Sequence, residues 1–239
     1  IVINLIGILF ENRKQNFANI HSDLPGLIAK YCSESEVKKF IHISAIGANA
    51  NSNSFYQQSK FNGEQKVLAN FKNTVIIRPS VVCGNEDNFT NLFAKLSISP
   101  VIPVVRPNYK FQPILVDDVA TAIIKIIETK KNEGKIYEIG GPTTISFKDM
   151  VESIVSTIRK KRFVVEMPMP LAKVQATLFS LMPKPLLTKD QCEILNETDN
   201  IVSNNHLTLK DLNIKPTDVQ QAMPKWLWRF RAGGEFAKI

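Results

Sequence analysis

Short apolar runs alternate with helical stripes along the first two thirds of the chain. The runs are rich in Ile and Val and predict buried strands at residues 1–6, 39–44, 74–78 and 135–139. The stripes repeat at helical spacing and predict helices over residues 17–31, 61–71, 117–127 and 147–158. Ser146 is the expected N-cap of the last helix, whereas Pro25 is expected to kink or interrupt the first.

This alternation predicts an α/β protein with a doubly wound parallel sheet. The pattern changes from Phe163, because prolines break the later chain into short apolar segments. We therefore expect residues 1–162 to form the sheet domain, with lobe insertions, and residues 163–239 to form a smaller C-terminal lobe. The opening run Ile1 to Gly7 reads as a strand already inside a sheet, so we expect a fragment or a processed chain with a sheet that is incomplete at its N-terminus.

The composition is typical of a folded protein in a reducing compartment. The 239 residues are 44% hydrophobic, enough for a large core. Cys32, Cys83 and Cys192 lie far apart and form no Cys-x-x-Cys pair, so the sequence indicates neither a disulfide framework nor a metal site. No apolar stretch reaches the roughly 18 residues of a spanning helix, and the layout of a signal peptide is missing.

The net charge of +8 indicates either an anionic partner or a solvated basic surface. Basic residues are densest at 159–162 and 225–231, where Trp226 and Trp228 are interleaved. These residue types, together with an apolar segment at 171–182, suit an anionic membrane surface, although packing inside the small lobe is an equal alternative. We expect no nucleic-acid partner, because no helix-turn-helix, zinc finger or aromatic strand platform accompanies the charge.

A tyrosine and a lysine four residues apart are the sharpest chemical signal. Tyr56-Gln57-Gln58-Ser59-Lys60 follows the predicted strand that ends at Ser44, and positions i and i+4 of a helix share one face. An ammonium beside a phenol favours the phenolate, so we expect a lowered pKa at Tyr56 and a role as general acid or base. Lys60 is also a candidate donor to the hydroxyls of a ribose.

Five motifs occur in a fixed order along the chain: Asn4-Leu5-Ile6-Gly7, Ser44, Tyr56-x-x-x-Lys60, Arg78-Pro79-Ser80-Val81-Val82-Cys83-Gly84 and Val116-Asp117-Asp118-Val119-Ala120. In this series of motifs, the chain resembles the extended short-chain dehydrogenase/reductase family over most of the chain's length. The resemblance implies that residues 1–162 are the remainder of a Rossmann-like NAD(P)-binding domain. It also implies a role for each matching residue: a cofactor-lining turn at Asn4 and Gly7, an acid or base at Tyr56 assisted by Ser44, a ribose contact at Lys60, and nicotinamide contacts at Pro79 and Val82.

Two departures from the family pattern argue against catalysis. The assisting hydroxyl of the family aligns nearer to Ala45 than to Ser44, and a one-residue offset turns a strand side chain to the opposite face. The chain also has no Gly-x-x-Gly-x-x-Gly turn for a pyrophosphate. NADP(H) or NAD(H) is therefore expected only together with an upstream part.

Further stretches resemble one subgroup, the nucleotide-binding accessory subunit of respiratory complex I and its bacterial relatives. They include Phe17-Ala18-Asn19-Ile20-His21, His42-Ile43-Ser44-Ala45 and Leu187-Thr188-Lys189-Asp190-Gln191. The resemblance implies a bound NADPH without turnover, complex I subunits as partners, and a place at the mitochondrial matrix side or the bacterial cytoplasmic side of the inner membrane. Two alternatives stay open: an active oxidoreductase or nucleotide-sugar epimerase/dehydratase, and a membrane-surface module without nucleotide.

Overall fold

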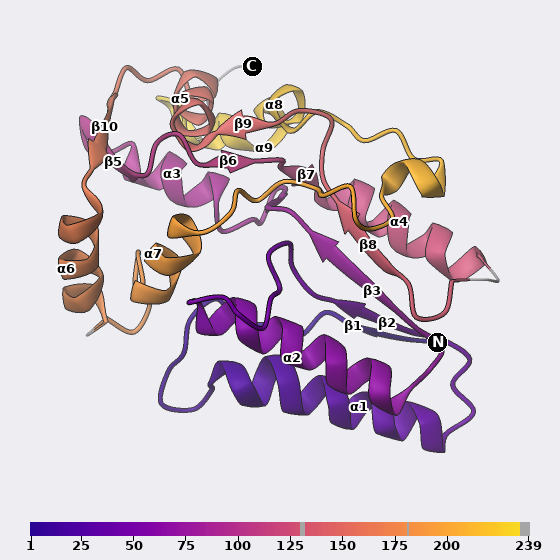
Figure 1. The fold of residues 1–239 in the computed structure, drawn as a ribbon. Helices are drawn as coiled ribbons and strands as arrows, with labels where there is room; N and C mark the ends of the chain where they lie inside the picture. Colours follow the sequence, from indigo (N-terminus) through magenta and orange to yellow (C-terminus); the bar gives the residue numbers. More distant parts are fainter. Residues whose placement is uncertain (130–131, 181, 235–239) are drawn as a thin grey trace.

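The predicted strands pair as one parallel sheet. The structure, a computed structural model, describes residues 1–129, 132–180 and 182–234. The sheet has the order β1-β2-β3-β8 and is parallel throughout (Figure 1), with strands β1 (Val2–Asn4), β2 (Phe40–Ile43), β3 (Thr74–Pro79) and β8 (Ile136–Ile139). The predicted fold class is therefore confirmed.

Helices cover both faces of this sheet (Figure 1). The pair α1 (Leu24–Glu34) and α2 (Phe55–Asn70) packs on one face, and α4 (Val116–Glu128) packs on the other. Successive residues of β2 show the division, because Phe40 joins the cluster with α1 and α2, whereas Ile41 joins the cluster with α4. Since α2 follows β2, its amino-terminal end lies near the carboxyl end of that strand.

The irregularity expected at Pro25 is a change of helix type. A π-helical turn, η1 (Ala18–Asp23), leads directly into α1, and the Leu24 N–H donates to the Asn19 carbonyl, five residues back. Pro25 then lies in the first turn of α1, and its missing N–H offers no α-helical hydrogen bond to the His21 carbonyl four residues back. The helix continues at this point without a break in the chain direction (Figure 1).

A second group of elements surrounds α5 (Phe147–Thr157). Ser146 is its N-cap, as predicted, and accepts a hydrogen bond from the Asp149 N–H. The group also contains α3 (Thr90–Leu96), α6 (Met169–Phe179), and the parallel pair β5 (Val101–Val105) and β10 (Phe163–Met167). One hydrophobic cluster contains residues from both sides of position 162, so the proposed division there crosses a shared core and stays a prediction.

The remaining elements are short and complete the C-terminal part. β4 (Val82–Cys83) pairs with β7 (Ile114–Leu115), and β6 (Lys110–Phe111) pairs with β9 (Ile145–Ser146). The last helices are α7 (Lys189–Asn196), η2 (Leu209–Leu212), α8 (Val219–Ala222), α9 (Pro224–Leu227) and η3 (Trp228–Phe230). Within the described ranges, no helix has the length and apolar character needed to span a bilayer.

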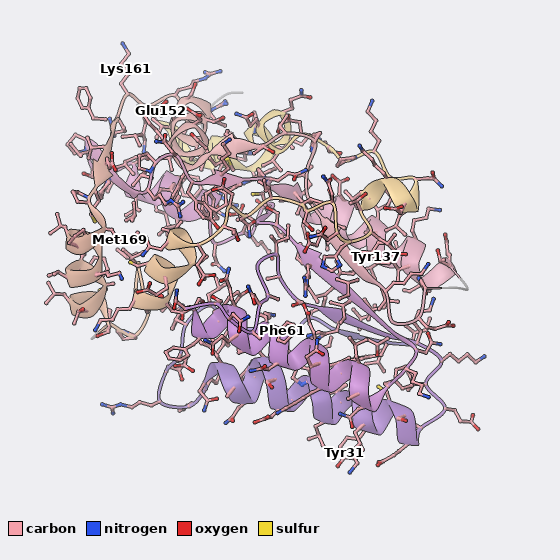
Figure 2. All side chains as sticks on the ribbon, in the orientation of Figure 1. Tyr31, Phe61, Tyr137, Glu152, Lys161 and Met169 are labelled. Atoms are coloured by element: carbon pink, nitrogen blue, oxygen red, sulfur yellow. The ribbon has the colours of Figure 1, made fainter. Side chains whose placement is uncertain are left out.

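The interleaved tryptophans of the basic C-terminal segment differ in environment. Trp226 is 6% exposed, belongs to the main hydrophobic cluster and donates its indole N–H to the Thr90 hydroxyl at 3.1 Å. Trp228 is only half-buried. Packing inside the lobe therefore accounts for Trp226. By contrast, Lys161 in the other basic cluster projects away from the molecule (Figure 2).

Candidate functional site at the ends of β1 and β2

Tyr56 and Lys60 lie in the first turns of α2, so the helical pairing predicted from their spacing is confirmed. The helix begins at Phe55 because Ser54 is its N-cap and accepts a hydrogen bond from a backbone N–H of the first turn. The Lys60 Nζ lies 5.9 Å from the centroid of the Tyr56 ring, within the range of a cation–π contact. The same ammonium donates to the Ile43 carbonyl at 3.3 Å, at the end of β2.

Burial sets the electrostatics of Lys60. The residue is 5% exposed, and desolvation lowers the pKa of its ammonium to about 8, although the Glu64 carboxylate partly offsets this. A Cβ at Gly7 would lie 3.4 Å from the Lys60 Nζ, so the turn after β1 reaches the same place. Gly7 and Lys60, which were predicted to share one site, are therefore neighbours in space.

The Tyr56 ring is enclosed by two aromatic rings that precede α1. Phe17 and His21 meet it edge-on, with ring centroids 5.7 and 5.2 Å away. Burial, and then the Asp190 carboxylate, raise the pKa of the Tyr56 phenol to about 12. The expectation of a lowered pKa at Tyr56 is therefore wrong, because burial disfavours the charged phenolate and the Asp190 carboxylate disfavours it further.

Both ring nitrogens of His21 are satisfied. Its Nε2 accepts from the Ile8 N–H at 2.9 Å, and Nδ1 therefore carries the proton that is donated to the Ser59 hydroxyl at 3.0 Å. That hydroxyl donates in turn to the Tyr56 carbonyl at 2.8 Å. Burial, together with the charge of Lys60, lowers the pKa of His21 to about 3, so the neutral ring links the turn after β1 to α2.

Two buried polar atoms beside this group, His42 Nε2 and Ser44 Oγ, have no hydrogen-bond partner in the described part of the chain. The Asn4 amide donates to His42 Nδ1 at 3.1 Å, and its oxygen is fixed by the Ile6 N–H, so the proton of His42 lies on Nε2. A buried group without a partner costs roughly 1–3 kcal/mol. These two atoms therefore mark the carboxyl end of β2 as a place where a hydroxyl-bearing ligand would make compensating hydrogen bonds.

A buried ion network lies one helical turn beyond Lys60. Arg78 Nε and Nη2 donate to the Glu64 carboxylate at 2.8 and 2.6 Å, and Nη1 donates to Glu138 at 3.3 Å. Glu138 also accepts from the Ser203 N–H at 2.9 Å. The network ties α2 to β3, β8 and the segment that follows α7, and so it fixes the helix on which Tyr56 and Lys60 lie.

Pro79 and Val82 lie further along the chain, at the exit from β3. Pro79 is buried at the strand end, where its carbonyl accepts from the Ile46 N–H at 3.1 Å, and Val82 packs toward the cluster under α4. Their contacts with a nicotinamide stay predictions, as do the roles of Tyr56, Lys60, Ser44, Asn4 and Gly7. Across the described residues, no group of three or more His, Cys, Asp or Glu side chains is arranged to hold a metal ion.

A carboxylate at the start of α4 links this helix to the C-terminal segment. The Asp118 carboxylate accepts from the Thr217 N–H at 2.7 Å. It does not cap the helix, because the N-cap position is Leu115 and no side chain bonds there. The hydrogen bond to Thr217 therefore holds the C-terminal segment against the start of α4.

Comparison with known proteins gives a family that covers most of the chain. Residues 10–231 match the family of the RmlD substrate binding domain. The chain is 30% identical to NADH dehydrogenase (ubiquinone) 1 alpha subcomplex subunit 9 of Dictyostelium discoideum, over 100% of this chain and 67% of that protein. It is 31% identical to the subunit of the same name from Mus musculus, over 97% of this chain and 62% of that one.

Solved structures agree on the fold. The dTDP-4-dehydrorhamnose reductase of Bacillus anthracis, solved in complex with NADP, superposes with a TM-score of 0.66 at 17% identity and covers 94% of this chain and 79% of its own. At 17% identity, the superposition shows that the two proteins share a fold and nothing further. The chain thus belongs to the RmlD substrate binding domain family, within the short-chain dehydrogenase/reductase fold, and is a homologue of the alpha subcomplex subunit 9 proteins.

Proposed function

We propose that this chain is an NAD(P)H-binding accessory or assembly subunit of respiratory NADH:quinone oxidoreductase (complex I) that does not turn over a substrate. The observation that carries the proposal is the match, along the whole chain, to subunits named NADH dehydrogenase at 30 and 31% identity. Its partners are then other subunits of that complex. Both relatives are named as mitochondrial, which favours the matrix side of the inner membrane. A bacterial homologue would occupy the cytoplasmic side.

The polar groups at the carboxyl end of β2, namely those of Lys60, Ser44 and His42, suit the ribose and nicotinamide of NADP(H) or NAD(H). Lys60 and the Ser44 hydroxyl would bond the ribose hydroxyls, and the His42 Nε2–H is a donor without an acceptor among the described residues. When bound, the dinucleotide supplies hydride-transfer chemistry. Asn4 and Gly7 line the same place, and Pro79 and Val82 are the proposed contacts on the nicotinamide side.

The environment of Tyr56 favours binding without turnover. A phenol whose pKa is raised to about 12 is a poor proton donor and is not a base near pH 7. The Ser44 hydroxyl makes no hydrogen bond within the described residues and so does not assist Tyr56. Both features favour a protein that keeps a nucleotide-binding fold but lacks the acid–base chemistry of an enzyme.

An active oxidoreductase or nucleotide-sugar epimerase/dehydratase is the second candidate. The observation that favours it is the retained Tyr56–Lys60 pair on one helical face, at the ends of parallel strands. Hydrogen bonds of a catalytic site often tighten only with substrate present. In this alternative, a substrate hydroxyl draws Ser44 and Tyr56 together.

Dinucleotide content and turnover of the full-length protein distinguish these candidates. We would purify the full-length protein, identify co-purifying dinucleotide by absorbance and mass spectrometry, and assay reduction and epimerisation of nucleotide sugars. Retained NADPH or NADH without turnover, together with co-migration with complex I on native gels, supports the accessory subunit. Turnover at ordinary enzymatic rates, lost in Tyr56→Phe, would establish the enzyme instead.

We also propose that α6 contacts an anionic membrane surface. Leu171, Val174 and Leu178 are 57, 59 and 64% exposed on one side of the helix, whereas the opposite side packs through two buried alanines. The helix lies at the left edge of the molecule (Figure 1), and Met169 at its start packs against the main hydrophobic cluster. Basic residues 159–162 precede the strand that leads into α6, and apolar side chains flanked by cations suit lipid headgroups. Leu181, part of the predicted apolar segment, lies outside the described residues.

Vesicle binding tests the membrane contact separately from nucleotide binding. The full-length protein should co-sediment with vesicles that contain anionic lipid, and Leu171→Ser with Leu178→Ser should abolish this. Tyr31→Ser, at an exposed aromatic position on the outer face of α1 (Figure 2), is the matched control. Vesicle binding by a protein that holds no dinucleotide would favour the remaining alternative, a membrane-surface module without nucleotide.

A further inference from the structure

The C-terminal part of the chain closes the amino-terminal end of the helix that carries Tyr56 and Lys60. Asp190, in the first turn of α7, accepts three hydrogen bonds from consecutive residues at the start of α2. The donors are the Ser54 hydroxyl at 2.8 Å, the Phe55 N–H at 2.6 Å and the Tyr56 N–H at 3.3 Å. One carboxylate thus supplies acceptors for N–H groups that a helix start leaves unpaired.

A second carboxylate from the same element holds the loop before α2. Glu197, at the C-cap of α7, accepts from the Ser52 hydroxyl at 2.9 Å and the Asn53 N–H at 2.5 Å. Both ends of α7 are therefore attached to residues 52–56. α7 itself is fixed, because Thr188 and Gln191 form a capping box at its start and Arg106 donates to the Glu197 carbonyl at 2.9 Å.

We propose that Asp190 is a positioning residue for the nucleotide site, through which α7 sets the place of Tyr56 and Lys60. This inference rests on the proposed nucleotide binding and extends it to a residue far away in sequence. The contact on the Tyr56 N–H fixes the backbone from which the phenol projects, and Lys60 follows on the same helical face. A carboxylate suits the task because its two oxygens accept all three donors and its charge complements the helix dipole.

The carboxylate also acts on the phenol by its charge. The titratable groups that face the Tyr56 ring are the neutral His21 and the Lys60 ammonium, and Asp190 is the anion that opposes ionisation of the phenol. Removal of this charge should therefore lower the pKa of Tyr56. A residue that merely stabilised the lobe would leave that titration unchanged.

Two substitutions in the full-length protein test the proposal, Asp190→Ala and the conservative Asp190→Asn. Asp211→Ala is the matched control, because Asp211 is also a capping carboxylate of the C-terminal part but caps η2. Readouts are NADPH affinity by fluorescence titration and phenol ionisation by ultraviolet difference absorbance, with Tyr56→Phe to identify the signal of Tyr56.

We expect Asp190→Ala to weaken NADPH binding about tenfold, the equivalent of losing a strong helix cap. Asp190→Asn should fall between wild type and Asp190→Ala, and both should shift Tyr56 ionisation to lower pH while Asp211→Ala changes neither. If Asp190→Ala fails to fold, Asp190→Asn decides. Unchanged ionisation of Tyr56 in a folded variant overturns the proposal. Wild-type protein that binds no NADPH refutes the proposed nucleotide binding instead, and the ionisation readout still decides on Asp190.

Discussion

Gly63 of α2 gives the backbone carbonyl of His21 the space it occupies. A Cβ built at Gly63 overlaps the His21 oxygen, which approaches from the π-helical turn η1. Pro25, four residues after His21, has no N–H with which to bond that carbonyl in an α-helix. The close approach of α2 to η1 therefore depends on two residues with unusual backbones, and it places the His21 ring against Tyr56.

We predict that Gly63→Ala destabilises the protein by about 2 kcal/mol or more. Alanine gains about 1 kcal/mol of helix propensity over glycine, but overpacking against a backbone atom that cannot rotate away costs more. The measurement is urea unfolding followed by circular dichroism. Gln65→Ala, at an exposed position of the same helix, is the control and should change the free energy of unfolding by less than about 0.5 kcal/mol. Equal stability of the two variants would refute the steric argument.

Most of the sheet could be predicted from the sequence because β2, β3 and β8 are short and buried along most of their length. The expectation of a buried strand at residues 1–6 is wrong, because β1 spans only Val2–Asn4 at the edge of the sheet and Ile3 is 39% exposed. Runs such as Thr74 to Arg78 and Lys135 to Ile139 carry a local signal, and β3 and β8 differ from them by a residue at an end. The i, i+4 relationship of Tyr56 and Lys60 was predictable for the same reason, since helical geometry is local. Residue Ser146 identified the start of α5 through its capping chemistry.

Acid should destabilise the protein through His21 and His42. Both rings are buried and neutral, and burial, followed by the charge of Lys60, lowers the pKa of each to about 3. The unfolded chain binds protons near pH 6.5 whereas the folded chain does not, so stability falls as pH drops from 6.5 toward 3. Each histidine should cost about 2 kcal/mol between pH 7 and pH 5.

Chemical unfolding at pH 7 and pH 5 measures this loss. The double variant His21→Asn with His42→Gln should lose less stability between the two pH values than the wild type does. His206→Gln removes the partly exposed third histidine and is the control for loss of a histidine side chain. A double variant with the full wild-type loss would assign the acid sensitivity to other groups.

Loss of Arg78, on β3, should be far more damaging than loss of Lys66, a surface cation on α2. Its guanidinium compensates Glu64 and Glu138, whose side chains are 0 and 6% exposed. We predict that Arg78→Met costs about 3–5 kcal/mol, because it leaves buried carboxylates uncompensated. Lys66→Met breaks the exposed pair with Asp23 and should cost less than about 1 kcal/mol. Thermal unfolding compares them, and similar melting temperatures would contradict the prediction.

Long-range polar contacts were beyond the reach of the sequence. Asp190 belongs to a motif that carried the subgroup resemblance, yet its contact with Tyr56 joins residues far apart in the chain, which no local pattern encodes. Burial, and then the charge of Asp190, raise the pKa of Tyr56, whereas the spacing of Tyr56 and Lys60 alone predicts the opposite direction. His42 was hidden for another reason: it occupies a buried strand position that the apolar run predicts to be core.

Lys60 should reduce stability in return for ligand binding. Burial lowers the pKa of Lys60 to about 8, so below that pH a buried charge destabilises the folded protein. This destabilisation disappears as pH rises from 8 toward 10.5, because the folded protein loses the proton before the unfolded chain does. We predict that Lys60→Met raises the free energy of unfolding at pH 7 by about 2 kcal/mol, after allowance for the lost hydrogen bond to Ile43. The same variant should bind NADPH more weakly than wild type.

Urea unfolding at pH 7 and pH 9.5 provides the check, because wild type should gain stability over this interval and the variant should lack that gain. A variant less stable than wild type at pH 7 would mean that Lys60 is a structural residue whose contacts outweigh its desolvation.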